Sequence, residues 1–392
     1  MALVTRQRST VTPRFNSLCS LGRGVEILVW LRRNQDGRAL AAVYPTKHDM
    51  PVLLRTYQWP RSFYLPLAEN SKPVSVSISS QTGEIFVLVD CSIQVFGRDG
   101  RLMRLWGGKG SVPGMFVSPW AVAVSSINRM IHVCVADAGK ASVEVLSDTG
   151  AWKHSLIPSA PSAAFQGLIG VAIHDDKVFC IDQLTGLVHC FAVDAGTYLQ
   201  CWGNAVDPIT QRPFLDHPIS LAVSANGNVF VCNASSGDVL EMVVFNRDGI
   251  FVRRWGGGRG TAQGQFFDVQ CVAVSPLSDE VFVSDAGYDW SDGDDSDTDP
   301  AQFVDPARRR VDRVQVFLAD GTFVRCLHLG SATDTSWPIY VKKTRVRVPA
   351  KCKQKKQPVA TFVPTGIAVT STGEVIVCDT AYNRVLVEVV GS

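Results

Sequence analysis

The sequence predicts an all-β protein built from six copies of a four-stranded unit. Short runs of alternating small and β-branched residues recur along the chain, which is the pattern of half-buried strands. Each run is followed by a second apolar strand that ends in Asp or Asn. Helix-period patterning is nearly absent, which argues against an α/β fold.

The first strand of each unit has a clear start and a regular spacing. The runs PVSVSI, PWAVAV, LIGVAI, PISLAV, VQCVAV and PTGIAV begin at residues 73, 119, 168, 218, 269 and 364. The first five starts are therefore separated by 46, 49, 50 and 51 residues. An acidic or amide residue ends each second strand: Asp90, Asp137, Asp182, Asn233, Asp285 and Asp379. We expect these side chains to accept backbone N–H bonds at the turn that follows, a structural role.

Two further strands complete most units. The third strands are SIQVFG, SVEVLS, LVHCFA, LEMVVF, RVQVFL and RVLVEVV. A turn such as Arg-Asp-Gly or Ala-Asp-Gly then leads to a fourth strand in RLMRLWGG, TYLQCWGN, FVRRWGGG and FVRCLHLG. We expect the Trp to pack in its strand and the glycines to form turns between units. Four short strands about every 50 residues predict the blades of a six-bladed β-propeller.

The last unit has only three strands before the chain ends at residue 392. The segment VLLRTYQWP at 52–60 ends in Trp59, as RLMRLW ends in Trp106 and FVRRW in Trp255. We therefore predict that an N-terminal strand completes the last blade, because closure removes exposed sheet edges. On this interpretation the propeller spans 51–392. Residues 25–50 form an extra hairpin, and a seven-bladed ring that uses it is the alternative.

Composition excludes some classes of protein. The formal net charge is +2, so no global attraction to nucleic acid or membranes is expected. The sequence contains no run of 18 apolar residues, so no membrane span is expected. The eleven cysteines form no C-x-x-C pair, which fits reduced thiols in the cytoplasm. Residues 1–24 contain four arginines and no acidic residue, which suggests a flexible basic terminus or, alternatively, a mitochondrial transit peptide.

Several segments resemble NHL repeats. These are GMFVSPWAVAV with VCVADAGKASVEVL, GQFFDVQCVAV with VFVSDAG and DRVQVF, and PTGIAV with VIVCDTAYNRVLV. The resemblance covers roughly residues 50–392, is strong in the fifth and sixth repeats, and is degraded in the third and fourth. It implies a six-bladed propeller that serves as a recognition platform. Cys19 is the only cysteine before residue 91, so the RING domain of some NHL ubiquitin ligases is absent from this sequence.

The sequence favours a non-catalytic scaffold or adaptor that binds another protein. A link to ubiquitin-dependent turnover is implied only by the family resemblance. RNA binding is an alternative, and a lyase or hydrolase with a metal in the central channel is a second. The seven histidines occupy unlike positions in their repeats, and only His217 lies near a channel-lining position, so we expect no metal site. No cofactor and no small-molecule substrate are indicated.

Two insertions enlarge the fifth repeat. Residues 287–310 begin with GYDWSDGDDSDTDP, which has six aspartates and no basic residue, and residues 328–363 are basic. Strand alternation places both on one rim of the propeller. The basic insertion could be a solvated loop, or it could bind phosphates. The residues that would bind phosphates are Lys342, Lys343, Arg345, Arg347, Lys351, Lys353, Lys355 and Lys356.

The acidic insertion has three interpretations. Ser291 and Ser296 each have an Asp three residues later, the pattern of acidophilic kinase sites. Clustered carboxylates also suit calcium, although the spacing is not that of an EF-hand. The third interpretation is a disordered, solvated loop.

Overall fold

The computed structural model describes residues 18–21, 25–33, 39–45, 62–65, 67, 72–127, 130–159, 163–235, 239–288, 310–327, 364–379 and 384–389. The chain divides into two compact units, Met1–Arg61 and Ser62–Ser392. Within the described residues, no helix is long and apolar enough to cross a membrane.

The first unit contains one small antiparallel sheet. Strands β2 (Val25–Arg33) and β3 (Ala39–Pro45) form a hairpin, and β1 (Leu18–Leu21) pairs with the other edge of β2. The order in this sheet is β1-β2-β3. The hairpin is thus not a blade of the ring that the second unit forms.

The second unit consists of six four-stranded antiparallel sheets. The first strands are β5 (Pro73–Ile78), β9 (Pro119–Ile127), β13 (Leu168–His174), β17 (His217–Val223), β21 (Val269–Val274) and β25 (Pro364–Val369). The second strands are β6 (Ile85–Val89), β10 (Met130–Asp137), β14 (Lys177–Asp182), β18 (Val229–Ser235), β22 (Val281–Tyr288) and β26 (Glu374–Asp379). We number the blades one to six in this order.

The outer half of each blade follows the same plan. The third strands are β7 (Ser92–Phe96), β11 (Ser142–Leu146), β15 (Leu187–Ala192), β19 (Val239–Phe245), β23 (Arg310–Phe317) and β27 (Arg384–Val389). The fourth strands are β8 (Leu102–Gly107), β12 (Trp152–Leu156), β16 (Tyr198–Trp202), β20 (Phe251–Gly258), β24 (Phe323–Leu327) and β4 (Ser62–Leu65). The structure therefore adds β12, which the sequence did not single out.

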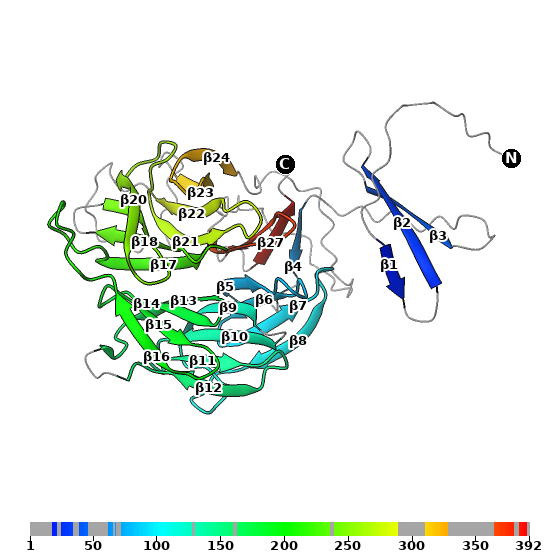
Figure 1. The fold of residues 1–392 in the computed structure, drawn as a ribbon, viewed down its shortest axis with the longest axis horizontal. Helices are drawn as coiled ribbons and strands as arrows, with labels where there is room; N and C mark the ends of the chain where they lie inside the picture. Colours follow the sequence, from blue (N-terminus) through cyan, green and yellow to red (C-terminus); the bar gives the residue numbers. More distant parts are fainter. Residues whose placement is uncertain are drawn as a thin grey trace, which may run out of the picture. The chain divides into compact units, whose positions relative to one another are not determined.

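The six sheets close into a ring. Each first strand contacts the first strands of both neighbouring blades, including β25 against β5, where the last blade meets the first. In Figure 1 the labelled first strands β5, β9, β13, β17 and β21 lie toward the middle of the ring. The prediction of an all-β, six-bladed β-propeller is confirmed.

A strand from the N-terminal side of the ring closes it, as predicted, but from a different segment. Strand β4 pairs antiparallel with β27 and brings Leu65 opposite Val385. The segment 52–60, chosen for Trp59, lies outside the described residues. In the pairing, Leu65 occupies the position that Trp106 holds opposite Ile93 in blade one. The closing strand thus carries Leu where the prediction looked for Trp.

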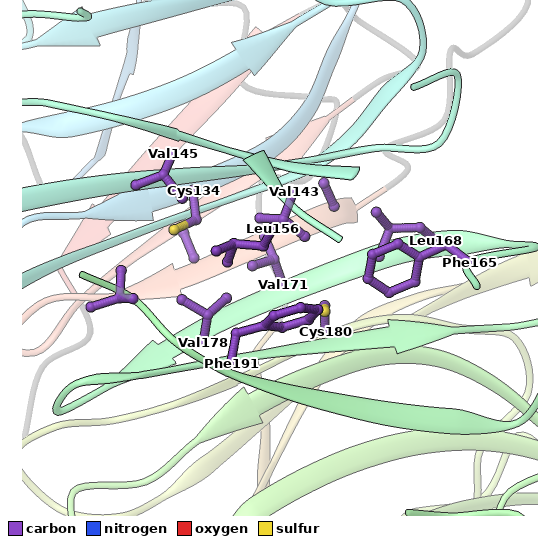
Figure 2. Close-up of a cluster of buried hydrophobic side chains, with 13 residues drawn as sticks. Cys134, Val143, Val145, Leu156, Phe165, Leu168, Val171, Val178, Cys180 and Phe191 are labelled. Atoms are coloured by element: carbon purple, nitrogen blue, oxygen red, sulfur yellow. The ribbon is translucent and has the colours of Figure 1, made fainter. Parts of the chain in front are cut away.

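The hydrophobic core lies between blades rather than inside them. One cluster joins blades two and three, with Cys134, Val143 and Val145 on one side and Val178, Cys180 and Phe191 on the other (Figure 2). Equivalent clusters lie between the other neighbouring blades. The cysteines predicted to be small core residues are buried: Cys134, Cys180, Cys232 and Cys378.

Every first strand begins with an irregularity. In blade two Pro119 pairs with Asp137 and Ala121 with Ala136, so Trp120 has no partner in the second strand. The same shift occurs in the other five blades. The residues left without a partner are Val74, Trp120, Ile169, Ile219, Gln270 and Thr365. Such bulges redirect a side chain and recur near binding sites.

Candidate interaction face

We define the loop face as the face where second strands end and first strands begin. Because the strands of a blade alternate in direction, its 2–3 and 4–1 connections both emerge there. The opposite face carries the 1–2 and 3–4 turns. Both insertions begin and end at strand ends on the loop face. The strand residues at these four points are Tyr288, Arg310, Leu327 and Pro364.

A buried carboxylate organises the loop face of blade two. Asp137 is fully buried, and its two oxygens accept the backbone N–H groups of Val117, Ser118, Gly139 and Lys140 at 2.8 to 3.3 Å. The first two precede β9, and the last two form the turn after β10. One side chain therefore fixes both connections, and four N–H bonds offset the cost of burying its charge.

The equivalent residues act in related ways. Asp182 accepts N–H groups from Gln166, Gly167, Leu184 and Thr185. Asn233 accepts one from Asp216 and donates to Ser235 and Glu241. Asp379 binds the Arg384 guanidinium at 2.8 Å. The prediction for Asp90 is wrong, because the strand register places Val89 at the equivalent position in blade one. Asp90 follows one residue later, is exposed, has a φ of +50°, and its own N–H binds the Lys72 carbonyl.

Blade five adds an arginine clamp to this arrangement. Asp285 accepts the N–H groups of Phe267 and Asp268 and forms a 2.8 Å ion pair with Arg313. The same guanidinium donates to the carbonyls of Thr261, Ala262 and Gln265. Burial raises the pKa of the neighbouring Asp268 carboxyl, although Arg259 opposes the shift. The connection between blades four and five is thereby held rigidly.

The connection between blades three and four is fixed by a second arginine. Arg254 on β20 binds Asp207 at 3.0 Å and Glu241 at 3.4 Å. Its guanidinium also lies over the rings of Phe214 and Phe251. The N–H of Ile209 is the main cause that lowers the pKa of Asp207, and Arg254 adds to it. This loop, too, is preorganised.

Exposed apolar side chains gather on the loop face across blades one to four. They come from 4–1 connections, from the 2–3 turn of blade three and from the bulge of β9. The residues are Val112, Val117, Trp120, Ile157, Leu184, Val206 and Ile209. Exposed apolar side chains also occur on the opposite face, at Met130, Trp152, Ile250, Leu277 and Leu318, so their number alone does not mark an interaction surface.

Trp120 is the most unusual member of this set. It is 50% exposed, although it lies in an innermost strand. The residues at the equivalent bulge positions are smaller, and each is only partly exposed: Val74, Ile169, Ile219, Gln270 and Thr365. Packing of the bulge therefore does not require an indole.

The connection that leads to Trp120 contacts the turns of blades one and two. The Cys91 thiol lies 3.8 Å from the Val117 carbonyl, which places the turn of blade one beside Val117. A Cβ added to Gly139 would meet Val117, so the turn of blade two lies on its other side. Lys140 Nζ binds the Val112 carbonyl at 3.3 Å. Blades one and two therefore share this surface, which we call the Trp120 patch: Asp90, Cys91, Val112, Val117, Trp120, Gly139 and Lys140.

Lysines border the patch. Lys72 precedes β5, and Lys109 lies in the connection that leads to β9; both are exposed. Neither forms an ion pair with the part of the chain that the structure describes. Lys140 is paired with the buried Glu144 at 3.6 Å. Asp90 is the exposed carboxylate of the patch, and two exposed lysines stand against it.

The described residues contain no group of three or more His, Cys, Asp or Glu side chains that could hold a metal ion. His217 begins β17 on the loop face, is 61% exposed and lies 3.3 Å from Asp216. His132 and His189 are fully buried within their blades, in β10 and β15. The structure thus does not bring these three histidines together around one point of the channel.

The predicted insertion sites remain predictions. The eight basic residues between 342 and 356 lie outside the described residues, as do Ser291 and Ser296. Trp120 is not among the site residues predicted from the sequence, although a signal is present: among the six aligned first strands, only PWAVAV has an aromatic second residue. The exposure of that residue depends on how the blades pack, which the alignment does not contain.

No family model matches the chain, and comparison with curated proteins finds no match. Solved structures with a similar fold include a gluconolactonase from Xanthomonas campestris, with 11% identity, a TM-score of 0.48, and coverage of 81% of this chain and 85% of the other. A chain of the mitotic checkpoint complex has 10% identity and a TM-score of 0.44 over 94% and 87% of the two chains. The WD40 propeller domain of Doa1 has 12% identity and a TM-score of 0.43 over 92% and 88%. At these values the similarities do not indicate a function.

Proposed function

We propose that this propeller is a non-catalytic platform that binds another protein through its loop face. The observation that carries the proposal is the half-exposed Trp120 among apolar side chains on a rigid surface. Tryptophan is enriched among the residues that dominate binding energy at interfaces. Buried Asp137 and Asp182 hold the loops in place, so little ordering is needed on binding.

We also propose that the propeller is of the NHL type. Blades five and six support this assignment because the motif residues act as pairs: Asp285 binds Arg313, and Asp379 binds Arg384. In each pair the Asp belongs to the second strand and the Arg stands opposite it in the third. In blades two and three Ser142 and Leu187 stand in place of this Arg, and Asp137 and Asp182 accept backbone N–H groups from the turn after the second strand.

The test is quantitative capture of partners from cells by the wild-type protein and two double variants. Trp120→Ala with Val112→Ser alters the loop face. Leu277→Ser with Leu318→Ser removes equally exposed apolar groups from turns of the opposite face. We expect partners that the wild type and the second variant retain and the first variant loses. Identical partners for the wild type and both variants would overturn the proposal, provided that these three proteins have the same melting temperature.

A further inference from the structure

We infer that the Trp120 patch binds an acidic protein segment with a bulky apolar side chain. The inference rests on the proposed function and names the chemistry of the partner. Trp120 offers a half-exposed apolar platform on the loop face, three residues after Val117 in the connection that also carries the exposed Val112. An apolar side chain from the partner would be removed from water there, at about 25 cal/mol for each Å² of apolar surface buried.

Charge complementarity selects the residues around that anchor. Lys72 and Lys109 are exposed and have no ionic partner among the described residues, whereas Lys140 is neutralised by Glu144. Asp90 alone opposes them within the patch. Carboxylates that flank the partner's apolar residue would pair with the two lysines, which favours encounter and register more than affinity.

The geometry keeps this surface open and rigid. Val117 and Ser118 donate to Asp137 at 2.8 Å, and Gly139 donates to the same carboxylate at 3.0 Å. Lys109 is held by a bridge to Phe116 across the same loop. The side chains of the patch therefore have fixed backbone positions before the partner arrives.

A single-stranded nucleic acid is the competing ligand, since aromatic side chains and lysines can also bind stacked bases and phosphates. Two features favour the peptide. Trp120 is the one aromatic residue among the exposed large apolar side chains of the loop face in the described chain; the others are Val, Ile and Leu. Asp90 would lie against the phosphates.

The experiment measures fluorescence anisotropy of labelled nine-residue peptides with the full-length protein. Each peptide has a central Leu, Phe or Trp, flanked by Asp and Glu, by Lys and Arg, or by Ser and Gly. A labelled oligo(U) strand is the nucleic-acid probe. We expect the acidic set to bind, and binding to weaken with salt.

Variants locate the site. Trp120→Ile introduces the residue that Ile169 and Ile219 supply in blades three and four, so the bulge should stay intact. We expect about a thirtyfold loss of affinity for the acidic peptides. The double variant Lys72→Glu with Lys109→Glu should abolish the preference for acidic flanks, whereas Lys177→Glu, in the first residue of β14, should leave it unchanged.

Three outcomes overturn the inference. Binding of neutral or basic peptides that still depends on Trp120 refutes the acidic partner and leaves the proposed platform standing. Binding of oligo(U) in place of peptides assigns the patch to nucleic acid. No binding of any probe refutes the peptide site; if partner capture is then also insensitive to Trp120, the proposed function fails as well.

Discussion

At the scale of single residues, buried histidines make the stability depend on pH. Burial lowers the pKa of His189 to about 4, against a small opposing effect of Asp182. The ring is fully buried, edge-on to Phe165, with Nδ1 3.3 Å from the Tyr198 hydroxyl. Burial also lowers the pKa of His132, with Lys153 adding to the effect. Both groups bind protons more readily in the unfolded chain.

We predict that the free energy of unfolding falls as the pH decreases below about 6.5, because the unfolded chain takes up the proton first. His189 alone should contribute about 1.4 kcal/mol per pH unit between 6.5 and 4. Urea unfolding at pH 7.5 and pH 5 measures the change. His189→Phe should reduce the slope. Equal slopes in the wild type and His189→Phe would contradict the prediction.

The repeat aspartates are a second residue-scale case, because one member is a natural control. Asp137→Ala removes a fully buried carboxylate and leaves four partly buried N–H groups without their acceptor, so we expect a loss of about 3 kcal/mol. Asp90→Ala removes an exposed carboxylate for which no such bonds are found, and should change stability by less, on the order of 1 kcal/mol. Melting curves of the two variants measure both losses of stability. Equal losses would contradict the prediction that Asp137 stabilises the protein more than Asp90.

At the scale of elements, the blades are joined by an aromatic contact that the sequence only partly predicts. A Cβ on Gly249 would lie 2.5 Å from the Trp202 ring, and Gly150 and Gly321 stand in the same relation to Trp106 and Trp255. Each glycine belongs to the 3–4 turn of the blade after the Trp. The Asp-Gly turns and the strand-end Trp, which look like separate signals in the sequence, therefore form one contact between blades.

This contact can be tested with two glycines of similar backbone conformation. Gly249 has φ +81° and Gly373 has φ +92°, so Ala is strained at both by about 1 kcal/mol. Only at Gly249 does the new methyl group meet an indole, since nothing lies within 4 Å at Gly373. We expect Gly249→Ala to lower the urea midpoint clearly more than Gly373→Ala. The opposite order would show that the turn conformation, not the contact, requires glycine.

The same position explains which strands the sequence misplaced. Opposite the third strand, Trp106, Trp202 and Trp255 occupy one register position in blades one, three and four. The other blades place leucine there: Leu65, Leu156 and Leu327. Trp is rare and marks a strand end, whereas Leu does not stand out in an apolar chain. The missed strand β12 and the misplaced closing strand both carry leucine, not Trp, at this position.

At the scale of the whole molecule, repeats were predictable and the candidate site was not. The architecture could be predicted from local features of six segments: their spacing, their apolar alternation and the Asp or Asn near the end of the second strand. The Trp120 patch depends on contacts between segments that are distant in sequence, such as Cys91 with Val117 and Lys140 with Val112. A single sequence does not contain this information about contacts, so it shows that Trp120 is unusual but not that it is exposed.

The ring itself depends on four residues at its N-terminal edge. Strand β4 pairs with β27 from Ser62 to Leu65, and Leu65 is 3% exposed in the core that joins the last blade to the first. Without β4, the backbone groups of β27 would form an unpaired edge, and such edges promote aggregation. The closing strand should therefore decide whether the propeller stays monomeric.

Two truncated chains make this a measurement. A chain that begins at residue 60 retains β4, and one that begins at residue 68 lacks it; neither contains the β1–β3 sheet. We expect the longer chain to be monomeric by size-exclusion chromatography with light scattering. The shorter chain should melt at lower temperature and self-associate, because losing the buried Leu65 costs about 2 to 5 kcal/mol before the open edge is counted. Identical behaviour of the two chains would mean that the contact of β25 with β5 holds the ring closed without β4.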